Sequence, residues 1–361
     1  MHRRSFMETL LGSALGSGLL PAAPVARARL GFASYSIRSH GLNATALLEY
    51  AAAQKVDIIQ LSVAGLGSRD EANLRRIKDE ADRLGIQVEP AYGGICTLGK
   101  GWNPQRQGDP VSYVTEAVRV ARAFGSPTVR CTVGGADDRY GKASMVELMD
   151  DTMKTLRAVR SRVEDSGVKL AFENHGELRA RELATVIEEA GKGICGVCYD
   201  SGNPLSVMED PLFTMEILGP YIVSSHFRDF VVYEHPRGAA MQWVAMGDGM
   251  ADLGQLIGRF RQFNPTAPVL LEIITGNEPK VLPYLEPDFW KFFPGMVAAD
   301  FARFVALAKK GYPYLGSMVV SRPGAAGAGL AAAIKEQQRA DLERSLEYCR
   351  KRLDLGQRWR G

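Results

Sequence analysis

The chain has 361 residues, of which 46% are hydrophobic and 24% are charged. That composition is typical of a folded protein with a sizeable core and excludes a chain that is disordered throughout. The formal net charge is +3, which is too small for a protein that binds nucleic acid mainly by neutralising phosphates. Five cysteines exclude the disulfide framework of a small secreted domain.

The N-terminal segment has the pattern of a twin-arginine export signal. Two arginines precede Ser-Phe within residues 3–6, an apolar run follows from Leu10 to Leu20, and Ala26-Arg27-Ala28 offers a cleavage site. The apolar run is too short to cross a bilayer of about 30 Å as a helix. We therefore expect residues 1–28 to be a signal peptide and the mature protein to be periplasmic, without membrane attachment. The alternative interpretation is a basic N-terminus with no role in export.

From residue 30 onward, short apolar runs alternate with longer stretches of helical period. The predicted strands are Leu30–Ser36, Val56–Ser62, Gln87–Tyr92, Thr128–Val133, Val168–Glu173, Ile194–Asp200, Tyr221–His226 and Pro268–Ile273. The predicted helices include Asn43–Gln54, Glu71–Leu84, Tyr113–Phe124, Met145–Asp165 and Arg181–Ala190. Near-continuous apolar strands that alternate with helices indicate a parallel sheet covered on both faces.

Eight strand–helix units favour a single α/β domain, a (β/α)8 TIM barrel, over an open doubly wound sheet. The first strand is not followed by the Gly-rich motif that binds dinucleotides, which argues against a Rossmann domain. We expect the barrel to span residues 29–312 and a C-terminal helical extension to span residues 313–361. Within the extension, residues 327–354 have the pattern of one long amphipathic helix packed on the outside of the barrel.

One long loop is expected after the eighth strand, at residues 274–296. It is rich in proline and aromatic residues, and in a TIM barrel a loop at this position lies on the face that carries the active site. Exposed aromatic side chains suit both a substrate lid and a contact in a homo-oligomer. The sequence leaves these two roles open.

Four predicted strands end in residue types that bind metal ions, namely Glu173, Asp200, His226 and Glu272. Their separations of 27, 26 and 46 residues correspond to one strand–helix unit each, with an insertion at residues 230–249 in the last. Because the strands of a barrel end at one rim, we expect the four side chains to meet. Three carboxylates in one cavity would repel one another without a cation. Together with an imidazole they suit Mn²⁺, Mg²⁺, Co²⁺ or Zn²⁺.

These strand ends carry a resemblance to a known superfamily. The segments concerned are Phe172-Glu173-Asn174-His175-Gly176, Tyr199-Asp200-Ser201-Gly202-Asn203, Ser225-His226-Phe227-Arg228-Asp229, Gly247-Asp248-Gly249-Met250-Ala251-Asp252 and Leu271-Glu272-Ile273. They resemble the sugar phosphate isomerase/epimerase superfamily of xylose isomerase-like TIM barrels, which includes ketose 3-epimerases, inosose dehydratases and endonuclease IV. The resemblance covers about residues 30–310. It is specific for the superfamily and says little about the substrate.

The resemblance implies a metal site and a mechanism. Glu173, Asp200, His226 and Glu272 would bind one divalent cation, and Mn²⁺ is the ion that we expect. Glu173 and Glu272 would be the catalytic acid/base pair, moving protons on opposite faces of the substrate. The cation would lower the pKa of a C–H group next to a carbonyl and stabilise the resulting enediolate.

Four further residues are expected to contact the substrate. His175 and Arg228 each lie two positions beyond a predicted ligand, so strand alternation directs them to the same side. The resemblance implies that Arg228 contacts substrate oxygens, and we expect His175 to form hydrogen bonds with the substrate. Glu89 and His40 are predicted to lie at the ends of the third and first strands and to line the pocket.

Three other features support weaker predictions. Trp102 and Trp243 lie in loops on the same face and suit either stacking on a sugar ring or packing. Ketose 3-epimerases have a histidine three residues after the aspartate ligand, whereas this chain has Asn203 at that position. The resemblance therefore does not imply that this protein acts on the same substrates as those enzymes. Cys195 and Cys198 form a C-x-x-C pattern inside a strand, where such positions face opposite sides, and we expect no zinc or redox site there.

The leading prediction is a metal-dependent isomerase or epimerase of a small carbohydrate. Predicted export argues against a phosphorylated substrate, because sugar phosphates are mainly intracellular. The alternative is a lyase or hydratase acting on a 3-keto-sugar or 3-keto-glycoside, since proton removal next to a carbonyl is the shared first step. A DNA-cleaving enzyme is disfavoured because only four of five histidines remain after signal cleavage. A sugar-binding barrel without activity is disfavoured by the complete ligand set.

Overall fold

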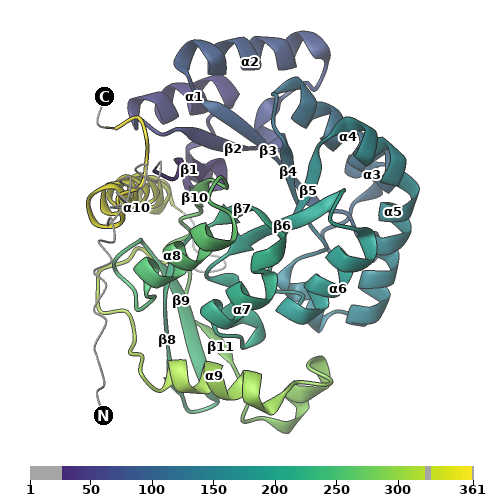
Figure 1. The fold of residues 1–361 in the computed structure, drawn as a ribbon. Coiled ribbons are helices and arrows are strands. Elements are labelled where there is room, and N and C mark those ends of the chain that lie inside the picture. The colour runs from purple at the N-terminus through teal and green to yellow at the C-terminus, as the bar shows by residue number, and fades with distance from the viewer. Residues whose placement is uncertain (1–26, 322–326, 360–361) are drawn as a thin grey trace, which may run out of the picture.

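Eight parallel strands form a barrel in the computed structural model, which describes residues 27–321 and 327–359 (Figure 1). In sheet order the strands are β10 (Val269–Leu271), β1 (Leu30–Ala33), β2 (Ile58–Ser62), β3 (Gln87–Gly94), β4 (Thr128–Thr132), β5 (Lys169–Glu173), β6 (Cys195–Asp200) and β7 (Ile222–His226). A parallel bridge between Phe227 and Leu271 joins the β7 and β10 edges. Each strand overlaps a predicted one, so the TIM barrel prediction is confirmed.

Long helices cover the outside of the barrel. They are α1 (Ala44–Ala53), α2 (Glu71–Leu84), α4 (Pro110–Ala123), α5 (Met145–Ser166), α6 (Ala180–Ala190), α7 (Pro211–Leu218), α8 (Leu253–Phe263) and α10 (Ala328–Leu353). Local sequence sets their ends, as α2 illustrates. The Asp70 side chain accepts a hydrogen bond from the backbone N–H of Asn73, and Gly85 ends the helix with a φ of 66°. Leu74 and Ile77 of α2 then lie in the main core.

Shorter helices connect these elements. They are α3 (Pro104–Gln107), η1 (Ser34–His40), η2 (Val63–Leu66), η3 (Ala136–Tyr140), η4 (Asn203–Val207), η5 (Gly219–Tyr221) and η6 (Pro287–Phe292). Several of them follow the carboxyl ends of barrel strands. They therefore contribute to the face of the barrel on which the predicted ligands lie.

Two insertions build a second unit beside the barrel (Figure 1). Strands β8 (Asp229–His235), β9 (Gly238–Val244) and β11 (Lys280–Leu282) form an antiparallel sheet, and α9 (Ala298–Ala308) packs against β8. We call the apolar residues that this unit encloses the aromatic cluster: Leu205, Val207, Met208, Phe230, Val232, Ala239, Met241, Leu282, Phe289, Phe293, Phe304 and Ala308.

The aromatic cluster corrects the prediction for residues 274–296. That segment was expected to be a loop with exposed aromatic side chains, but it contains β11 and η6, and none of its five aromatic residues is exposed. Phe289 and Phe293 are buried because they pack inside the cluster, with ring centroids 5.0 Å apart. The β8–β9 hairpin, which the sequence analysis described only as an insertion, provides the surface that they cover.

Helix α10 occupies the place of the eighth barrel helix. Its residues Leu342 and Leu346 belong to the main core, and the helix contacts η1 and β10. Tyr50 of α1 donates a hydrogen bond to Glu343 at 3.2 Å. The long outer helix agrees with the prediction. The second insertion, which carries β11 and α9, separates this helix from β10 in the sequence.

The predicted signal peptide lies outside the described residues except for its last two positions. Arg27 forms an ion pair with Asp354 at 3.0 Å, and Ala28 is buried in the main core. Export therefore stays a prediction. In residues 27–321 and 327–359, no helix combines the length and the apolar character that a membrane crossing needs.

Candidate active site

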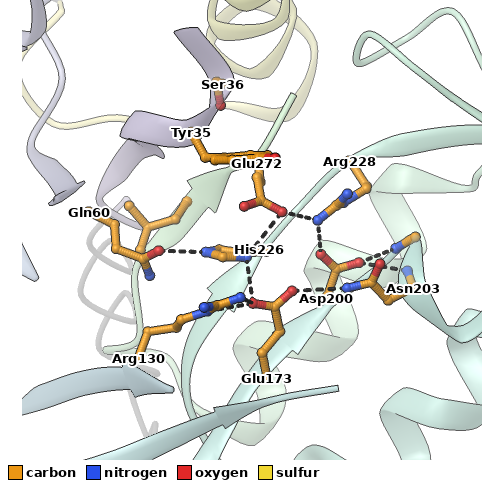
Figure 2. Close-up of polar contacts among 12 residues, drawn as sticks. Tyr35, Ser36, Gln60, Arg130, Glu173, Asp200, Asn203, His226, Arg228 and Glu272 are labelled. Carbon is orange, nitrogen blue, oxygen red and sulfur yellow. Dashed lines mark hydrogen bonds and ion pairs between the residues drawn. The ribbon is translucent and has the colours of Figure 1, made fainter. Parts of the chain in front are cut away.

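Four side chains at the carboxyl ends of neighbouring strands form what we call the four-ligand cluster (Figure 2). Glu173, Asp200 and His226 are the last residues of β5, β6 and β7, and Glu272 directly follows β10. Potential ligand atoms of these residues all lie within 4.8 Å of one another, and all four residues are buried. The structure thus brings together the four residues that the sequence predicts as ligands.

Glu173 is held at both of its oxygens. Its Oε2 accepts a hydrogen bond from Arg130 Nε at 2.6 Å, and its Oε1 accepts one from Asn203 Nδ2 at 2.9 Å. Burial favours a higher pKa for the Glu173 carboxyl, but the charges of Arg130 and His226 outweigh it and lower the pKa well below its ordinary value. Glu173 is therefore an ionised carboxylate, and none of its side chain is exposed.

Arg228 joins the other two carboxylates of the cluster. Its Nη2 donates a hydrogen bond to Asp200 Oδ2 at 2.5 Å and another to Glu272 Oε2. Burial raises the pKa of Asp200 and outweighs the lowering effect of Arg228. For Glu272, burial is outweighed by His226 and Arg228, so its pKa is lowered. The two arginines thus compensate most of the negative charge of the three carboxylates.

The donor set fits a divalent cation held by Glu173, Asp200, His226 and Glu272. Three carboxylates and one imidazole nitrogen suit Mn²⁺, Mg²⁺, Co²⁺ or Zn²⁺. His226 Nδ1 is buried, has no hydrogen-bond partner in the described part of the chain, and lies 3.1 and 3.5 Å from Glu173 Oε2 and Glu272 Oε2. A buried unpartnered nitrogen beside two carboxylates is satisfied when a metal ion binds. Cys198 of the C-x-x-C pattern also lies within 4.8 Å of potential ligand atoms of Glu173 and His226.

A cavity of about 850 Å³ opens over the cluster. Its walls come from the strand ends and the following loops, where TIM barrel enzymes bind their substrates, and its size suits a small molecule. Predicted contact residues that line it are His175, Arg228, Trp102 and Trp243, together with Asn203. Of the four ligands, Glu272 alone lines the cavity, so this carboxylate is the one that a bound substrate reaches directly.

Two predicted substrate contacts lie elsewhere, and the prediction is wrong for both. Glu89 is the third residue of β3, which continues to Gly94, and it is enclosed by hydrogen-bond donors inside the barrel. His40 ends η1 and not β1, and its Nε2 lies 2.9 Å from the carbonyl oxygen of Lys335 in α10. Neither residue lines the cavity. Glu89 lies five residues before the end of β3 and His40 lies seven residues after the end of β1, so neither side chain is at a strand end.

Sequence analysis missed two residues of the site, Arg130 and Gln60. Arg130 is the one charged residue of β4, and Gln60 is the one amide of β2. A long polar side chain in the middle of a buried strand needs a polar partner inside the protein. That signal was present in both strands. It did not identify the partners, because they come from distant positions in the chain.

Comparisons with known proteins support this description. The family described as xylose isomerase-like TIM barrel matches residues 48–291, which is more than half of the chain. The chain is 22% identical over 218 residues to a 3-oxo-isoapionate decarboxylase from Pectobacterium atrosepticum, covering 60% of this chain and 72% of the relative. That relative is named as a decarboxylase.

Two solved structures share the fold. A D-psicose 3-epimerase in the presence of D-fructose has a TM-score of 0.58 and 15% identity, covering 89% of this chain and 98% of that one. The IOLI protein with a bound zinc atom has a TM-score of 0.52 and 14% identity, covering 78% and 95%. Such identities show the fold alone, whereas the family match covers seven of the eight barrel strands and all four residues of the four-ligand cluster. The chain belongs to the xylose isomerase-like TIM barrel family.

Proposed function

We propose that this protein is a divalent-metal-dependent isomerase or epimerase of a small, non-phosphorylated carbohydrate, working by proton transfer through an enediolate. The observation that carries the proposal is the four-ligand cluster below the cavity, with the carboxylate of Glu272 open to that cavity. Membership of a family whose relatives include an epimerase and a decarboxylase supports it. Mn²⁺ is the ion that we expect the cluster to bind. That the protein forms a homo-oligomer stays a prediction.

A divalent cation held by the four ligands would polarise the substrate carbonyl and stabilise the negative charge that develops on the substrate oxygens. The proton itself must be moved by a group of the chain. Glu272 is placed for this step because it lines the cavity and 9% of its side chain is exposed. His175 and Arg228 line the same cavity and are placed to orient the hydroxyl and carbonyl groups of the substrate.

Glu173 is less suited to be the second proton-transfer group. Arg130 and Asn203 occupy its two oxygens, and its side chain is fully enclosed. To accept a proton from the substrate, Glu173 would have to leave an ion pair and a hydrogen bond. The contacts therefore support a role as a metal ligand for Glu173, and they support Glu272 as the one proton-moving carboxylate.

A lyase or hydratase acting on a 3-keto-sugar or 3-keto-glycoside is the second candidate. The single open carboxylate favours it, because elimination needs one base next to the carbonyl, whereas epimerisation moves protons on two faces. In the elimination, Glu272 would take the proton, the C–H electron pair would form the new double bond, and the leaving group would depart with its bonding pair. One relative is named as a decarboxylase and not as an isomerase.

Two further points concern the substrate. Arg130 and Arg228 are already paired with carboxylates of the cluster, so their positive charges are compensated before a phosphate group could bind. A periplasmic location rests on residues 1–28 as a twin-arginine signal. That location would agree with a substrate found outside the cytoplasm.

The test is to incubate the mature protein with Mn²⁺ in D₂O and to follow a panel of free sugars and 3-keto-glycosides by NMR. Deuterium at a carbon next to a carbonyl, together with a new isomer, would support the isomerase or epimerase. Loss of water or of an aglycone would support the lyase. A Mn²⁺-loaded protein that catalyses no exchange with any member of the panel would contradict the proposal.

A further inference from the structure

A row of three buried side chains connects the barrel interior to the four-ligand cluster. Glu89 of β3 lies 2.7 Å from Gln60 of β2, and Gln60 lies 2.8 Å from His226 of β7. Each of the three residues is at most 2% exposed. Figure 2 shows Gln60 at one edge of the His226 ring, with Glu173 and Glu272 at the other. The row therefore reaches His226 at the edge of the ring that lies opposite the carboxylate ligands.

Glu89 determines how Gln60 is oriented. It accepts hydrogen bonds from Gln60 Nε2, from Thr128 Oγ1 at 2.6 Å and from Ser224 Oγ at 2.8 Å. In all three contacts the Glu89 oxygens are the acceptors, and an amide can donate only through its NH₂ group. Gln60 must therefore direct its NH₂ group to Glu89, and its carbonyl oxygen is left facing His226.

Gln60 in turn determines which nitrogen of His226 faces the cluster with a free lone pair. A carbonyl oxygen can only accept, so the hydrogen between Gln60 and His226 belongs to Nε2 of the imidazole. In the neutral ring, the lone pair is then on Nδ1, which is the buried nitrogen without a hydrogen-bond partner. Histidines that bind metals usually donate their other N–H to a fixed acceptor, which sets the orientation of the ring.

We propose that Glu89 and Gln60 are positioning residues of the metal centre, which hold His226 with Nδ1 directed at the four-ligand cluster. Glu89 contacts neither the substrate cavity nor any of the four ligands; it acts through Gln60 alone. This role replaces the substrate contact that the sequence predicts for Glu89. The inference rests on the proposed function in one respect, because the cluster must bind a divalent cation.

The decisive variant is Glu89→Gln. The variant keeps the shape of the side chain but no longer fixes the orientation of the Gln60 amide. A carboxamide at position 89 can donate a hydrogen bond to Gln60, so Gln60 can turn its NH₂ group towards His226. We expect the Kd for Mn²⁺, measured by calorimetry on metal-free protein, to rise by about 10- to 100-fold. In ¹⁵N NMR of histidine-labelled, Zn²⁺-loaded protein, the His226 Nε2–H signal of the wild type should weaken or disappear. An unchanged Kd with an unchanged signal would overturn the proposal.

Two further variants make the test independent of folding defects. Ser224→Ala is the matched control, because it removes one donor to Glu89 but leaves the contact with Gln60, and its Kd should stay within a few-fold of the wild type. Gln60→Met keeps the length of the side chain without an acceptor and should weaken Mn²⁺ binding as Glu89→Gln does.

The double variant should bind Mn²⁺ no more weakly than Gln60→Met, since both changes act through one contact. Losses that simply add would overturn the proposal. A wild-type protein that binds no Mn²⁺ would overturn the proposed function as well. Equal Mn²⁺ affinity in the wild type, Glu89→Gln and Gln60→Met would overturn only the positioning role.

Discussion

The four-ligand cluster and the aromatic cluster are both buried, but different forces hold them. In the four-ligand cluster, Arg130 and Arg228 pair with carboxylates that the barrel encloses. Such pairs recover little more than the cost of removing the charges from water. In the aromatic cluster, rings such as Phe289 and Phe293 remove apolar surface from water and pack against each other.

This difference separates chemistry from stability. A buried group of charges that adds little to folding is expected where the charges perform a function, whereas the aromatic cluster is expected to hold the inserted unit in place. The two regions meet at Trp243 of β9, whose ring centroid lies 4.6 Å from the guanidinium carbon of Arg228. The β8–β9 hairpin thus supports one wall of the cavity. Substitutions in the four-ligand cluster should therefore alter turnover and metal binding, and substitutions in the aromatic cluster should alter the free energy of unfolding.

Glu272→Gln should have the largest effect, and it should be on turnover. The amide keeps the shape of the side chain but cannot accept the proton, so we expect turnover to fall by about 10²- to 10⁴-fold while the substrate still binds. Steady-state rates together with equilibrium binding of the substrate measure the two effects separately. The free energy of unfolding should change little by comparison. Full activity in this variant would rule out the proton-transfer role of Glu272.

Asp200→Asn should have the next largest effect, and it should be on metal content. Replacing a charged ligand by a neutral one weakens binding of a hard cation, so we expect less than about a tenth of an equivalent of metal after dialysis. Atomic emission analysis of the wild type and the variant gives the result. A stoichiometric metal content in Asp200→Asn would remove Asp200 from the ligand set.

The sequence predicts both the barrel and the four-ligand cluster because its strand–helix units repeat regularly. Parallel strands end at one rim, so the positions of Glu173, Asp200 and His226 at strand ends are sufficient to bring them together. Glu89 shows where this argument fails. Glu89 lies five residues before the end of β3, so its side chain belongs to the barrel interior and not to the rim.

Contacts between distant residues could not be predicted in this way. The sequence gives no register between Arg130 and Glu173 or between Gln60 and His226, although each pair is in hydrogen-bonding contact. The aromatic segment was misjudged for a related reason. Phe293 is covered by chain from both insertions, and that cover depends on tertiary packing that no local pattern reports.

Phe304→Ala should lower stability without removing the metal site. Phe304 of α9 is completely buried in the aromatic cluster, and truncation of a buried phenylalanine costs about 3–5 kcal/mol. Denaturant unfolding gives the free energy of unfolding, and calorimetry gives the affinity for Mn²⁺. Leu285→Ala is the matched control, because Leu285 lies in the same insertion but is 65% exposed. Loss of Mn²⁺ binding in folded Phe304→Ala protein would show that the two regions are not separable.

Glu209 provides the smallest and sharpest test, because it brings a charge to the edge of the aromatic cluster. It directly follows Val207 and Met208 of that cluster, and burial raises the pKa of its carboxyl to about 7, although hydrogen bonds from Ala180 and Thr214 partly offset this. The folded state therefore holds the proton more tightly than the unfolded chain. Its contribution to stability is complete below the unfolded pKa of about 4.5 and is lost as the pH rises through about 7.

We expect Glu209→Gln, which cannot ionise, to escape this loss. Between pH 5 and pH 7.5, as round test values, the unfolding free energy of the variant should rise relative to the wild type by about 2 kcal/mol. Urea unfolding of both proteins across this range measures the difference, and Mn²⁺ affinity should be equal in both. Parallel pH curves would mean that Glu209 is ionised at no cost. In that case a buried carboxylate without a cationic partner would be tolerated outside the four-ligand cluster, and the contrast between the two regions would lose its basis.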